Sequence, residues 1–553
     1  MNVPAGLSTE MCDMVIQTLK QVTSRELPDD FILQLDEKDE FPMEVIQKML
    51  SPDVGLHLIF LPENAGGLGG GARDICRVSE EMAKVDLGVA TAFLAICLGT
   101  DPILVGGTDE QKSKWLSRIA GEGLIVAYGV TEPAAGSNVA SIQTTADQIL
   151  DADGNVTGYR INGTKQFITN GGVAQLYTIL AKTPSGPSFF VVERDTPGLS
   201  VGKHEEKHGI RASNTTGVIL EDVEVPLENL IGGQEGVGLK QANAVFGYTR
   251  LMVGAFGLGG GQGALERALD YALTREQFGG PIYDKQGYRL KLLVESWIDL
   301  EAGRAYAEQT ALTIDEGNPD LATEGSIAKY WCTEAGLKAA NNAIQALGGY
   351  GYTREYLVEK MYRDVRITTI YEGTSEIQQS IIGMFRWKET ARSKGAFYEG
   401  VAADLDKVHA ENGNVGADLV AAAVRGVNTV VLALHQARQT RNQMVMFAMA
   451  DMMTIAEIAA ALATKAGRLA SAADSRAEHF ADMSRVFARK AQGEVLSGAR
   501  RALLGFGDAT DTEAVAAAQS VLQKLEEGMP LSAQAGLWTD MDKVAETLRD
   551  NHQ

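Results

Sequence analysis

The chain is poor in cysteine, proline and histidine. Its 553 residues include 4 cysteines, 14 prolines and 7 histidines. The cysteines, Cys12, Cys76, Cys97 and Cys332, lie far apart and form no CxxC pair. This spacing argues against a zinc ribbon or a disulfide framework. We expect buried or idle thiols in a reducing compartment.

The sequence also lacks an evident targeting or membrane segment. Its first residues, "MNVPAGLSTEMCDMV", contain no basic region followed by an apolar one, so no signal peptide is expected. We find no apolar run near the ~18 residues that suggest a membrane span, so membrane association is not expected. A cytoplasmic protein is the default expectation.

Positive charge is in short supply. Lys and Arg number 50 against 72 Asp and Glu, which gives a net charge of −22. Such a chain should be soluble and should repel nucleic acid and anionic membranes overall. With 45% hydrophobic residues, its length is enough for several domains around a large core.

The hydrophobic periodicity changes along the chain and indicates four domains. Residues 1–122 place apolar residues at helical steps, as in "ARDICRVSEEMAKVD". Residues 123–235 contain short β-rich runs bounded by Gly, Pro, Asn and Asp. Helical patterns return in residues 236–390, and residues 391–553 form a further helical segment rich in Ala and Met. We predict a mostly helical α+β protein: an N-terminal helical domain, a middle β domain, a C-terminal helical bundle and an extra helical domain.

Several patterns resemble functional motifs but favour a structural interpretation. "HEEKH", from His204 to His208, matches HExxH, yet its neighbours read as turns and strands rather than the helix that a zinc site needs. The glycines of "GLGGGQGALERAL" follow a helical run rather than a strand, so close helix packing is favoured over a dinucleotide fingerprint.

Two further patterns also have a structural explanation. "LDADGNVTGYRING" indicates a hairpin with its turn at Asp153-Gly154 better than a calcium loop, since later carboxylate positions are missing. The Met-rich stripe of the last segment is more typical of a core than of a cofactor site.

Three separated groups of motifs carry a family resemblance. They are "YGVTEPAAGSNVAS" (128–141), "KQFITNG" (165–171), and the set "TREQFGGPI" (274–282), "IQALGGYGYTREYLVEKMYRD" (344–364) and "IYEGTSEIQ" (370–378). In this order they resemble the acyl-CoA dehydrogenase family of flavoproteins, whose helix–β–helix fold agrees with the periodicity. The match covers roughly the first 390 residues. The extension resembles the extra domain of the very-long-chain branch in position and helical character.

The resemblance implies FAD and the α,β-dehydrogenation of a saturated acyl-CoA to trans-2-enoyl-CoA. The α-hydrogen leaves as a proton and the β-hydrogen as a hydride to flavin N5. Because the α C–H is a very weak acid, the reaction needs a base beside that carbon and donors on the thioester oxygen.

Glu372 of "YEGT" would be the base by this resemblance, with its backbone N–H as one of the donors. Its neighbours Ile370, Tyr371 and Gly373 would help to desolvate the carboxylate and raise its pKa, and Tyr371 and Gly373 would contact substrate. The structural alternative is a carboxylate favoured near a helix N-terminus.

Glu376 lies in a different sequence context. Ser375 and Gln378 have the spacing of a capping box, which predicts Glu376 in the first helical turn. We assign Glu376 and Thr374 to flavin contact or to the start of the helix.

A subset of the family carries its base on another helix. In the corresponding stretch, "FGYTRLMV", the residue before Arg250 is Thr249, which leaves Glu372 as the candidate. Arg250 resembles the family arginine that holds CoA, although Gly247 stands where relatives have an acidic residue.

Flavin binding carries over, by resemblance, to residues in all three groups of motifs. Tyr128, Val130 and Thr131 would line the isoalloxazine ring, Ser137 would reach the flavin phosphates or CoA, and Phe167, Ile168 and Thr169 would pack on the other ring face. Arg275 and Gln277 would meet the pyrophosphate, and Phe278 and Gln286 would lie near the adenosine. Gln345, Gly348 and Gly349 would reach the flavin of a neighbouring subunit. For Gly348 and Gly349 a simple helix break is the alternative.

The segment 86–108 resembles the helix that lines the acyl pocket. No Lys or Arg occurs between Lys84 and Lys112, which favours an uncharged acyl tail. Phe93, Ile96 and Cys97 are candidates to line the pocket, or they belong to the core.

The family passes electrons to electron-transferring flavoprotein, and this is the partner that we expect in fatty acid beta-oxidation. An oxidase is less favoured because "YEGTSEIQ" is intact. The resemblance of the extension to the extra domain of the very-long-chain branch implies a homodimer rather than a tetramer. A basic helix in "SRVFARKAQGEVLSGARRALLGF" could touch a membrane, but a solvated basic face is favoured.

Two other classes of function compete with catalysis. A nucleic-acid-binding relative that protects DNA against alkylation has a basic extension, whereas this chain is strongly acidic. A catalytically idle assembly factor would not need Glu372.

Overall fold

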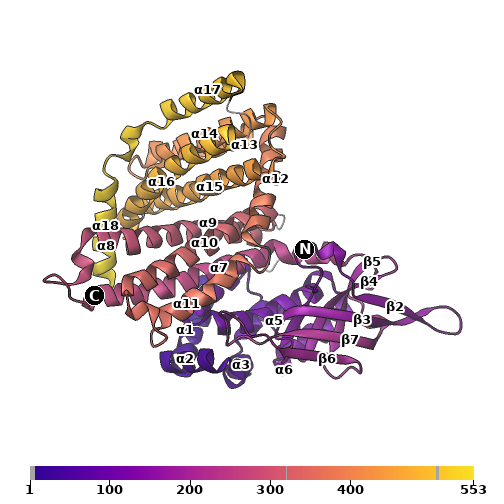
Figure 1. The fold of residues 1–553 in the computed structure, drawn as a ribbon. Helices are drawn as coiled ribbons and strands as arrows, with labels where there is room; N and C mark the ends of the chain where they lie inside the picture. The colour runs from indigo at the N-terminus through magenta and orange to yellow at the C-terminus, as the bar shows by residue number, and fades with distance from the viewer. Residues whose placement is uncertain (1–5, 319–320, 506–509, 553) are drawn as a thin grey trace. The chain divides into compact units, whose positions relative to one another are not determined.

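The computed structural model describes residues 6–318, 321–505 and 510–552, without the side chains of residues 246–248. Its contacts divide the chain into two compact units (Figure 1). Unit 1 contains Met1–Gly263, Ala311–Ala322 and Arg354–Glu372, and unit 2 contains Ala264–Thr310, Thr323–Thr353 and Gly373–Gln553.

Unit 1 begins with helices whose ends follow capping chemistry. They are α1 (Thr9–Glu26), α2 (Asp29–Lys38), α3 (Met43–Leu50), α4 (Ala72–Val85), α5 (Leu87–Gly106) and α6 (Asp109–Glu122), with short turns η1 (Leu56–Phe60) and η2 (Glu63–Ala65). The Ser8 side chain caps α1, and Asp86 caps α5 by accepting from Val89 N–H at 2.8 Å. Thr108 and Gln111 form a capping box at α6.

The expectation about membrane-length segments is wrong. By length and composition alone, α5, α14 (Ala417–Gln436) and α15 (Gln443–Ser471) are long and apolar enough to cross a membrane. The apolar windows of these helices are 83%, 56% and 72% buried inside the protein, respectively. A helix that is apolar on all sides is also what a large core requires, so hydropathy alone does not separate the two cases.

A seven-stranded sheet follows in unit 1. Its strands are β1 (Val126–Gly129), β2 (Thr145–Leu150), β3 (Val156–Thr169), β4 (Leu176–Thr183), β5 (Gly186–Glu193), β6 (Leu199–His204) and β7 (Thr215–Pro226). Their order is β1-β4-β2-β3-β7-β6, with β5 paired to β4. Helix α5 packs against β1. Short turns η3 (Val139–Ser141) and η4 (Leu227–Asn229) flank the strands.

The predicted hairpin at Asp153-Gly154 is confirmed. Strands β2 and β3 are antiparallel, and in Figure 1 their hairpin projects beyond the rest of the sheet. The Asp151 carboxylate accepts from the backbone N–H groups of Asp153 (2.9 Å) and Asn155 (2.8 Å), which closes the turn.

Helix α7 (Gly238–Thr274) runs from unit 1 into unit 2, and its glycines serve close packing, as predicted. A Cβ on Gly259 would lie 2.1 Å from the Glu80 carbonyl oxygen, and one on Gly263 would lie 2.3 Å from that of Lys84. These contacts bring α7 against the chain of α4, as only glycine allows.

A buried charge cluster holds the start of α5 in unit 1. Lys360, on α11 (Leu357–Val365), donates to Asp364 at 2.6 Å and also to the α5 cap Asp86. Asp364 in turn accepts from Ile210 N–H at 2.6 Å. The turn η8 (Arg366–Thr369) follows and leads to Glu372.

Unit 2 is helical. It contains η5 (Ile282–Asp284), α8 (Gln286–Arg289), η6 (Leu290–Val294), most of α9 (Glu295–Asp315), α10 (Ala322–Leu347), η7 (Tyr350–Tyr352), α12 (Ser375–Arg392), α13 (Ala396–Glu411), α14, α15, α16 (Ala477–Leu504), α17 (Thr512–Gly528), η9 (Leu531–Gln534) and α18 (Leu537–His552). The helices of residues 391–553 share this unit with α10 and α12. The predicted order of helices, sheet, helices and further helices is confirmed.

The Met-rich stripe belongs to the core of unit 2, as predicted. Met449, Met452 and Met453 of α15 are at most 1% exposed. Helix α15 packs against α12, α14 and α16, and Figure 1 shows α14, α15 and α16 as neighbouring helices. Flexible methionines suit the irregular spaces between such helices.

Candidate active site

The predicted base lies in a strained turn. Glu372 has φ 55° and Gly373 has φ 92°, so two successive residues adopt left-handed conformations. Few non-glycine residues adopt a positive φ, and such strain clusters at functional sites. Phe167 (φ 56°), predicted to pack on the flavin ring, and Phe278 (φ 55°), predicted to lie near the adenosine, share this feature.

Helix α12 begins directly after this turn, with a cap one residue earlier than predicted. Thr374, not Ser375, is the N-cap, and its hydroxyl accepts from Ile377 N–H at 3.4 Å. The Ser375 hydroxyl instead donates to Glu334 at 2.5 Å. Thr374 has the extended ψ of 161° that an N-cap needs, and sequence spacing alone could not choose between neighbouring hydroxyls. Glu376 lies in the first turn of α12, as predicted.

A residue that the sequence analysis missed holds the Gly373 carbonyl. Lys329 of α10 is 0% exposed, and its ammonium donates to the Gly373 oxygen at 2.8 Å. The Gln378 side chain donates to the same oxygen at 3.0 Å. A lysine inside an alanine-rich helical pattern gives no signal of this contact, because its partner lies 44 residues later.

Unit 1 brings several predicted residues close to Glu372. Burial raises the pKa of Tyr128, and the nearby charges of Glu372 and Asp101 raise it further. Burial likewise raises the pKa of Tyr371, whose hydroxyl faces Thr91. Burial lowers the pKa of Arg250, and the charge of Glu372 opposes this shift. Arg250 also donates to the Ala322 carbonyl at 3.2 Å, whereas the surroundings of Gly247 fall outside what the structure describes.

A buried ion pair, also missed, supports the predicted flavin-facing segment. Lys165 of β3 donates to Glu132 at 2.6 Å and to the Val130 carbonyl at 3.2 Å. Burial lowers the pKa of Lys165 to about 8, although Glu132 opposes this shift. Burial acts to raise the pKa of Glu132, but hydrogen bonds from Lys165, Thr144 and Gln143 hold it below its usual value. The pair ties the end of β1 to β3, where the flavin ring is predicted to lie.

The other predicted flavin residues of unit 1 differ in exposure. Phe167 at the end of β3 is 64% exposed, and Ile168 beside it is 2% exposed. Val130 is buried, Tyr128, Thr131 and Thr169 are half-buried, and Ser137 is exposed. Among the described residues, the buried Tyr128 hydroxyl has no hydrogen-bond partner.

The predicted acyl-pocket residues lie on the inner side of α5. Phe93, Ile96 and Cys97 are at most 1% exposed. The Phe93 ring packs on Phe60, with centroids 5.6 Å apart, and the Cys97 thiol lies 3.9 Å from the Asp101 carboxylate. These contacts fit core packing, and a role in the acyl pocket stays a prediction.

In unit 2, a loop after α7 carries the residues predicted to meet the pyrophosphate and adenosine. Gln277 N–H donates to the Gly280 carbonyl and Ile282 N–H donates to that of Arg275, which folds residues 275–282 back on themselves. Phe278 lies in this loop and is 91% exposed. The Arg275 guanidinium lies 5.9 Å from the centre of the Tyr350 ring.

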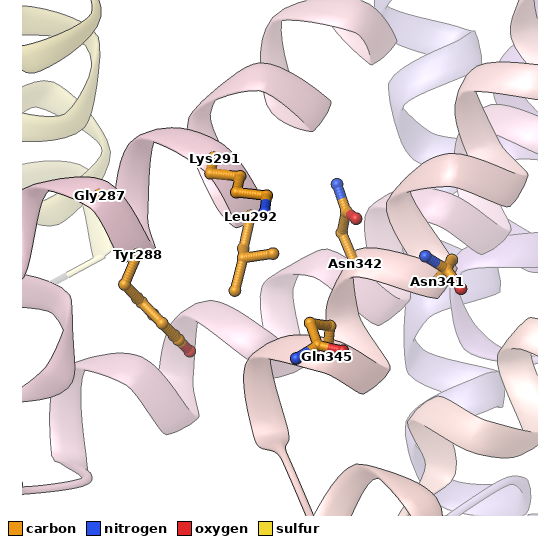
Figure 2. Close-up of a pocket in the computed structure, with 7 residues that line it drawn as sticks. All are labelled: Gly287, Tyr288, Lys291, Leu292, Asn341, Asn342 and Gln345. Carbon is orange, nitrogen blue, oxygen red and sulfur yellow. The ribbon is translucent and has the colours of Figure 1, made fainter.

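A cavity of about 480 Å³ in unit 2 is lined by residues of α8, η6 and α10. Figure 2 shows Tyr288 and Leu292 facing Gln345, which is a predicted flavin residue, across it. Its full lining is Gly287, Tyr288, Lys291, Leu292, Asn341, Asn342 and Gln345. At Gly348 and Gly349, just after α10, an added Cβ would meet only open space within 4 Å.

The last helix of the chain reaches the same region. Gln286, predicted to lie near the adenosine, donates to Asp542 of α18 at 2.6 Å, and Arg289 donates to that carboxylate at 2.7 Å. The buried Tyr283 hydroxyl donates to the Ala545 carbonyl at 2.6 Å. The extension therefore supports the segment that carries Gln286.

Each unit carries side chains that fit part of a flat, extended anionic cofactor. In unit 1, the exposed Phe167 ring and the buried Tyr128 hydroxyl suit a flavin ring. In unit 2, the exposed Phe278 ring, the Arg275 guanidinium and the uncrowded Gly348 and Gly349 suit a pyrophosphate and adenosine. Metal chemistry has no comparable support within the part of the chain that the structure describes, since no group of three His, Cys, Asp or Glu side chains could hold an ion. His204 ends β6 and His208 lies in the next loop, so they do not share a helix face.

Comparison with known sequences gives matches along most of the chain. Family models for the N-terminal, middle and C-terminal domains of acyl-CoA dehydrogenase match residues 9–122, 127–223 and 236–385. An acyl-CoA dehydrogenase of Bacillus subtilis (strain 168) is 38% identical over 382 residues, which are 66% of this chain and 98% of that protein. Cyclohexane-1-carbonyl-CoA dehydrogenase of Geobacter metallireducens is 37% identical over 391 residues, covering 69% of this chain and 99% of that one.

Solved structures also align with this chain. Butyryl-CoA dehydrogenase of Megasphaera elsdenii aligns with a TM-score of 0.64 and 34% identity over 68% of this chain and 98% of its own. A Bacillus anthracis acyl-CoA dehydrogenase, solved in complex with FAD, covers 100% of this chain and 97% of its own with a TM-score of 0.83. At 24% identity this second likeness shows the fold alone, and it includes the extension.

Proposed function

This chain belongs to the acyl-CoA dehydrogenase family, and on that premise we propose that it oxidises a saturated acyl-CoA with an uncharged tail to the trans-2-enoyl-CoA. It is a flavin-dependent oxidoreductase that acts on CH–CH bonds and uses FAD. We further propose that Glu372 is the base. The observation that carries this assignment is the left-handed turn at Glu372. The charge of Glu372 is near enough to Tyr128 and Arg250 to act on the pKa of both side chains.

The chemistry needs a base held rigidly beside a weakly acidic carbon. The Glu372 carboxylate would take the α-proton, and the turn that holds it fixes the direction from which it acts. Bound FAD would supply the acceptor for the hydride that leaves the β-carbon. The Glu372 N–H would donate to the thioester oxygen, where negative charge develops as the proton leaves.

The remaining residues would bind and orient. Arg250 carries the positive charge expected to hold CoA, and Ser137 would reach the same anionic groups or the flavin phosphates. Tyr128, Val130, Thr131 and Phe167 would enclose the flavin ring. The buried Lys165–Glu132 ion pair would hold the segment after β1 against β3, and removing either partner would leave an uncompensated buried charge.

Substrate class follows from the chemistry of α5. An acyl tail that ends in a carboxylate would need a nearby cation, and residues 86–108 contain no Lys or Arg. Phe93, Ile96 and Cys97 of this helix are apolar and would face the acyl chain. We therefore propose an uncharged acyl chain.

Electron-transferring flavoprotein is the acceptor that we propose. A relative from Acetobacterium woodii, 35% identical over 381 residues, is named a caffeyl-CoA reductase-Etf complex subunit. That name describes a reductase, so the test should follow both directions of the reaction. We also propose a cytoplasmic homodimer that serves fatty acid beta-oxidation; a solution mass of four chains would contradict the dimer.

The test is a panel of acyl-CoA thioesters added without oxygen to the purified yellow protein. Short, medium, long, branched and cyclic saturated acyl chains should be compared with a dicarboxylic one, and the flavin absorbance read after each addition. We expect bleaching by one uncharged class and none by the dicarboxylic thioester. A protein that holds FAD but is bleached by no thioester would overturn the proposal.

A further inference from the structure

We propose that Lys329 is a positioning residue for the catalytic glutamate, acting through the Gly373 carbonyl. This inference rests on the proposed function of Glu372 as base. It assigns a role to a buried cation on α10, which lies 43 positions before the glutamate in the sequence.

The first support is the unusual backbone at the turn. Glu372 and Gly373 both have positive φ, at 55° and 92°. A left-handed glutamate is unfavourable because its Cβ approaches the following carbonyl, so surrounding contacts must hold it. Gly373 supplies a second left-handed residue without this steric penalty.

The second support is the way in which the Gly373 carbonyl is held. It accepts from Lys329 Nζ at 2.8 Å and from Gln378 Nε2 at 3.0 Å. Both donor side chains are 0% exposed. Fixing this oxygen fixes the ψ angle of Gly373 and, through the preceding peptide, the direction in which the Glu372 backbone enters the turn.

The third support is the choice of residue. An ammonium buried at 0% exposure is strongly unfavourable unless it is well hydrogen-bonded, and a neutral amide could donate to a carbonyl at lower cost. A charge-assisted hydrogen bond is shorter and stronger than a neutral one. A lysine at this position therefore suits a peptide that must be held against strain.

Other lysines of unit 2 are placed differently. Lys338, on the same helix, is 39% exposed and pairs with Asp299 at 3.0 Å and Glu295 at 3.3 Å. These contacts join α10 to α9 and do not involve the turn. Lys338 therefore provides a matched control on α10.

The main experiment compares Lys329→Met with Lys338→Met in the full-length protein loaded with FAD. We expect Lys329→Met to lower kcat by about 10²-fold, as a small misplacement of a catalytic group does, with little change in KM. Lys338→Met should retain kcat. Equal kcat in the wild type and a folded Lys329→Met variant, or an equal loss in Lys338→Met, would overturn the proposal.

A second measurement separates positioning of the base from hydride transfer. Exchange of the substrate α-hydrogens with deuterium from D₂O reports proton abstraction by the base. This exchange should slow in Lys329→Met by the same factor as kcat. Unchanged exchange alongside slower flavin reduction would overturn the assignment.

A milder variant covers the case in which Lys329→Met does not fold. Gln378→Met removes the other donor to the same carbonyl and should lower kcat in the same direction by a smaller factor. An unchanged kcat in this variant would overturn the proposal.

Amide exchange by mass spectrometry gives a readout that needs no substrate. Residues 371–378 should exchange faster in Lys329→Met than in the wild type, with little change in α13 and α14. Unchanged exchange in residues 371–378 would overturn the inference. This arm remains decisive even if the wild type oxidises no acyl-CoA, an outcome that would refute only the proposed function.

Discussion

The two ends of α12 are held in different ways. At its beginning, α10 supplies Lys329 and Glu334, which contact Gly373 and Ser375 beside the proposed base. Toward its end, Arg386 is 5% exposed and donates to Glu457 of α15, at 2.9 and 3.0 Å.

The cluster around Arg386 is larger than a single ion pair. Arg386 also donates to Glu324 at 2.6 Å and Glu389 at 2.7 Å, while the Tyr306 and Tyr398 hydroxyls donate to Glu457 at 3.1 and 2.9 Å. The C-terminal family match ends at residue 385, so this cluster joins the family fold to the extension. The comparison separates a beginning of α12 that lies beside the proposed base from an end that joins the helix to the extension.

The largest expected effect is at the first end. Glu372→Gln keeps the size of the side chain but removes its basicity, so turnover should fall by roughly 10²- to 10⁴-fold. The flavin absorbance and the unfolding midpoint should stay near those of the wild type. Steady-state kinetics with the bleaching thioester measure the change. Unaltered turnover would place the base elsewhere, and the proposed difference in function between the two ends of α12 would be lost.

The next effect is at the other end. Arg386→Met leaves Glu457 and Glu324 without their cation, which should reduce the free energy of unfolding by about 3–5 kcal/mol. Turnover per bound flavin should change little at temperatures where the variant is folded. Urea unfolding followed by circular dichroism measures the loss.

An exposed ion pair provides the control for Arg386. Lys407 and Asp404 are 72% and 76% exposed, so Lys407→Met should leave the unfolding midpoint nearly unchanged. If Arg386→Met instead abolished turnover in a fully folded protein, the two ends of α12 would not be separable in function.

The smallest expected effect tests how close to the beginning of α12 the stabilising contacts of the extension reach. Asp451 of the extension accepts from Tyr330 at 2.9 Å and from Gln379 at 2.7 Å, close to the beginning of α12. Asp451→Asn should reduce the free energy of unfolding by about 1–2 kcal/mol, because two hydrogen bonds lose their charged acceptor. A loss of turnover larger than the loss of stability would mean that the extension also positions the base.

Periodicity was sufficient to predict the order of helices and strands, because amphipathic helices and alternating strands bury their faces locally. The glycines of α7 and the methionines of α15 were also assigned correctly from pattern alone. Hydropathy failed for α5, α14 and α15, since a helix buried on all sides has the same composition as a membrane span.

The candidate site was predictable only where motifs carry it. The family resemblance selected Glu372, Arg250 and the segments around Tyr128 and Phe167. Lys329 lies outside these motifs and acts through a backbone carbonyl, so it had no such signal. Glu132 and Lys165 lie within the motif segments, but their pairing was not predictable because the two residues are 33 positions apart. Likewise the cap at Thr374 depends on a backbone angle that neighbouring hydroxyls do not reveal.

The contact between α18 and the start of the helical bundle has a consequence for biosynthesis. The Tyr283 hydroxyl and its acceptor at Ala545 are 262 residues apart, so the acceptor is made much later than its donor. At about 5–20 residues per second, a ribosome needs roughly 10–50 s to cover that distance. Unit 1 can begin to fold early, but the segment from Tyr283 to Arg289 must wait until α18 has been made. Truncation before α18 would leave that segment permanently exposed, with its buried hydroxyl and charged groups unmatched.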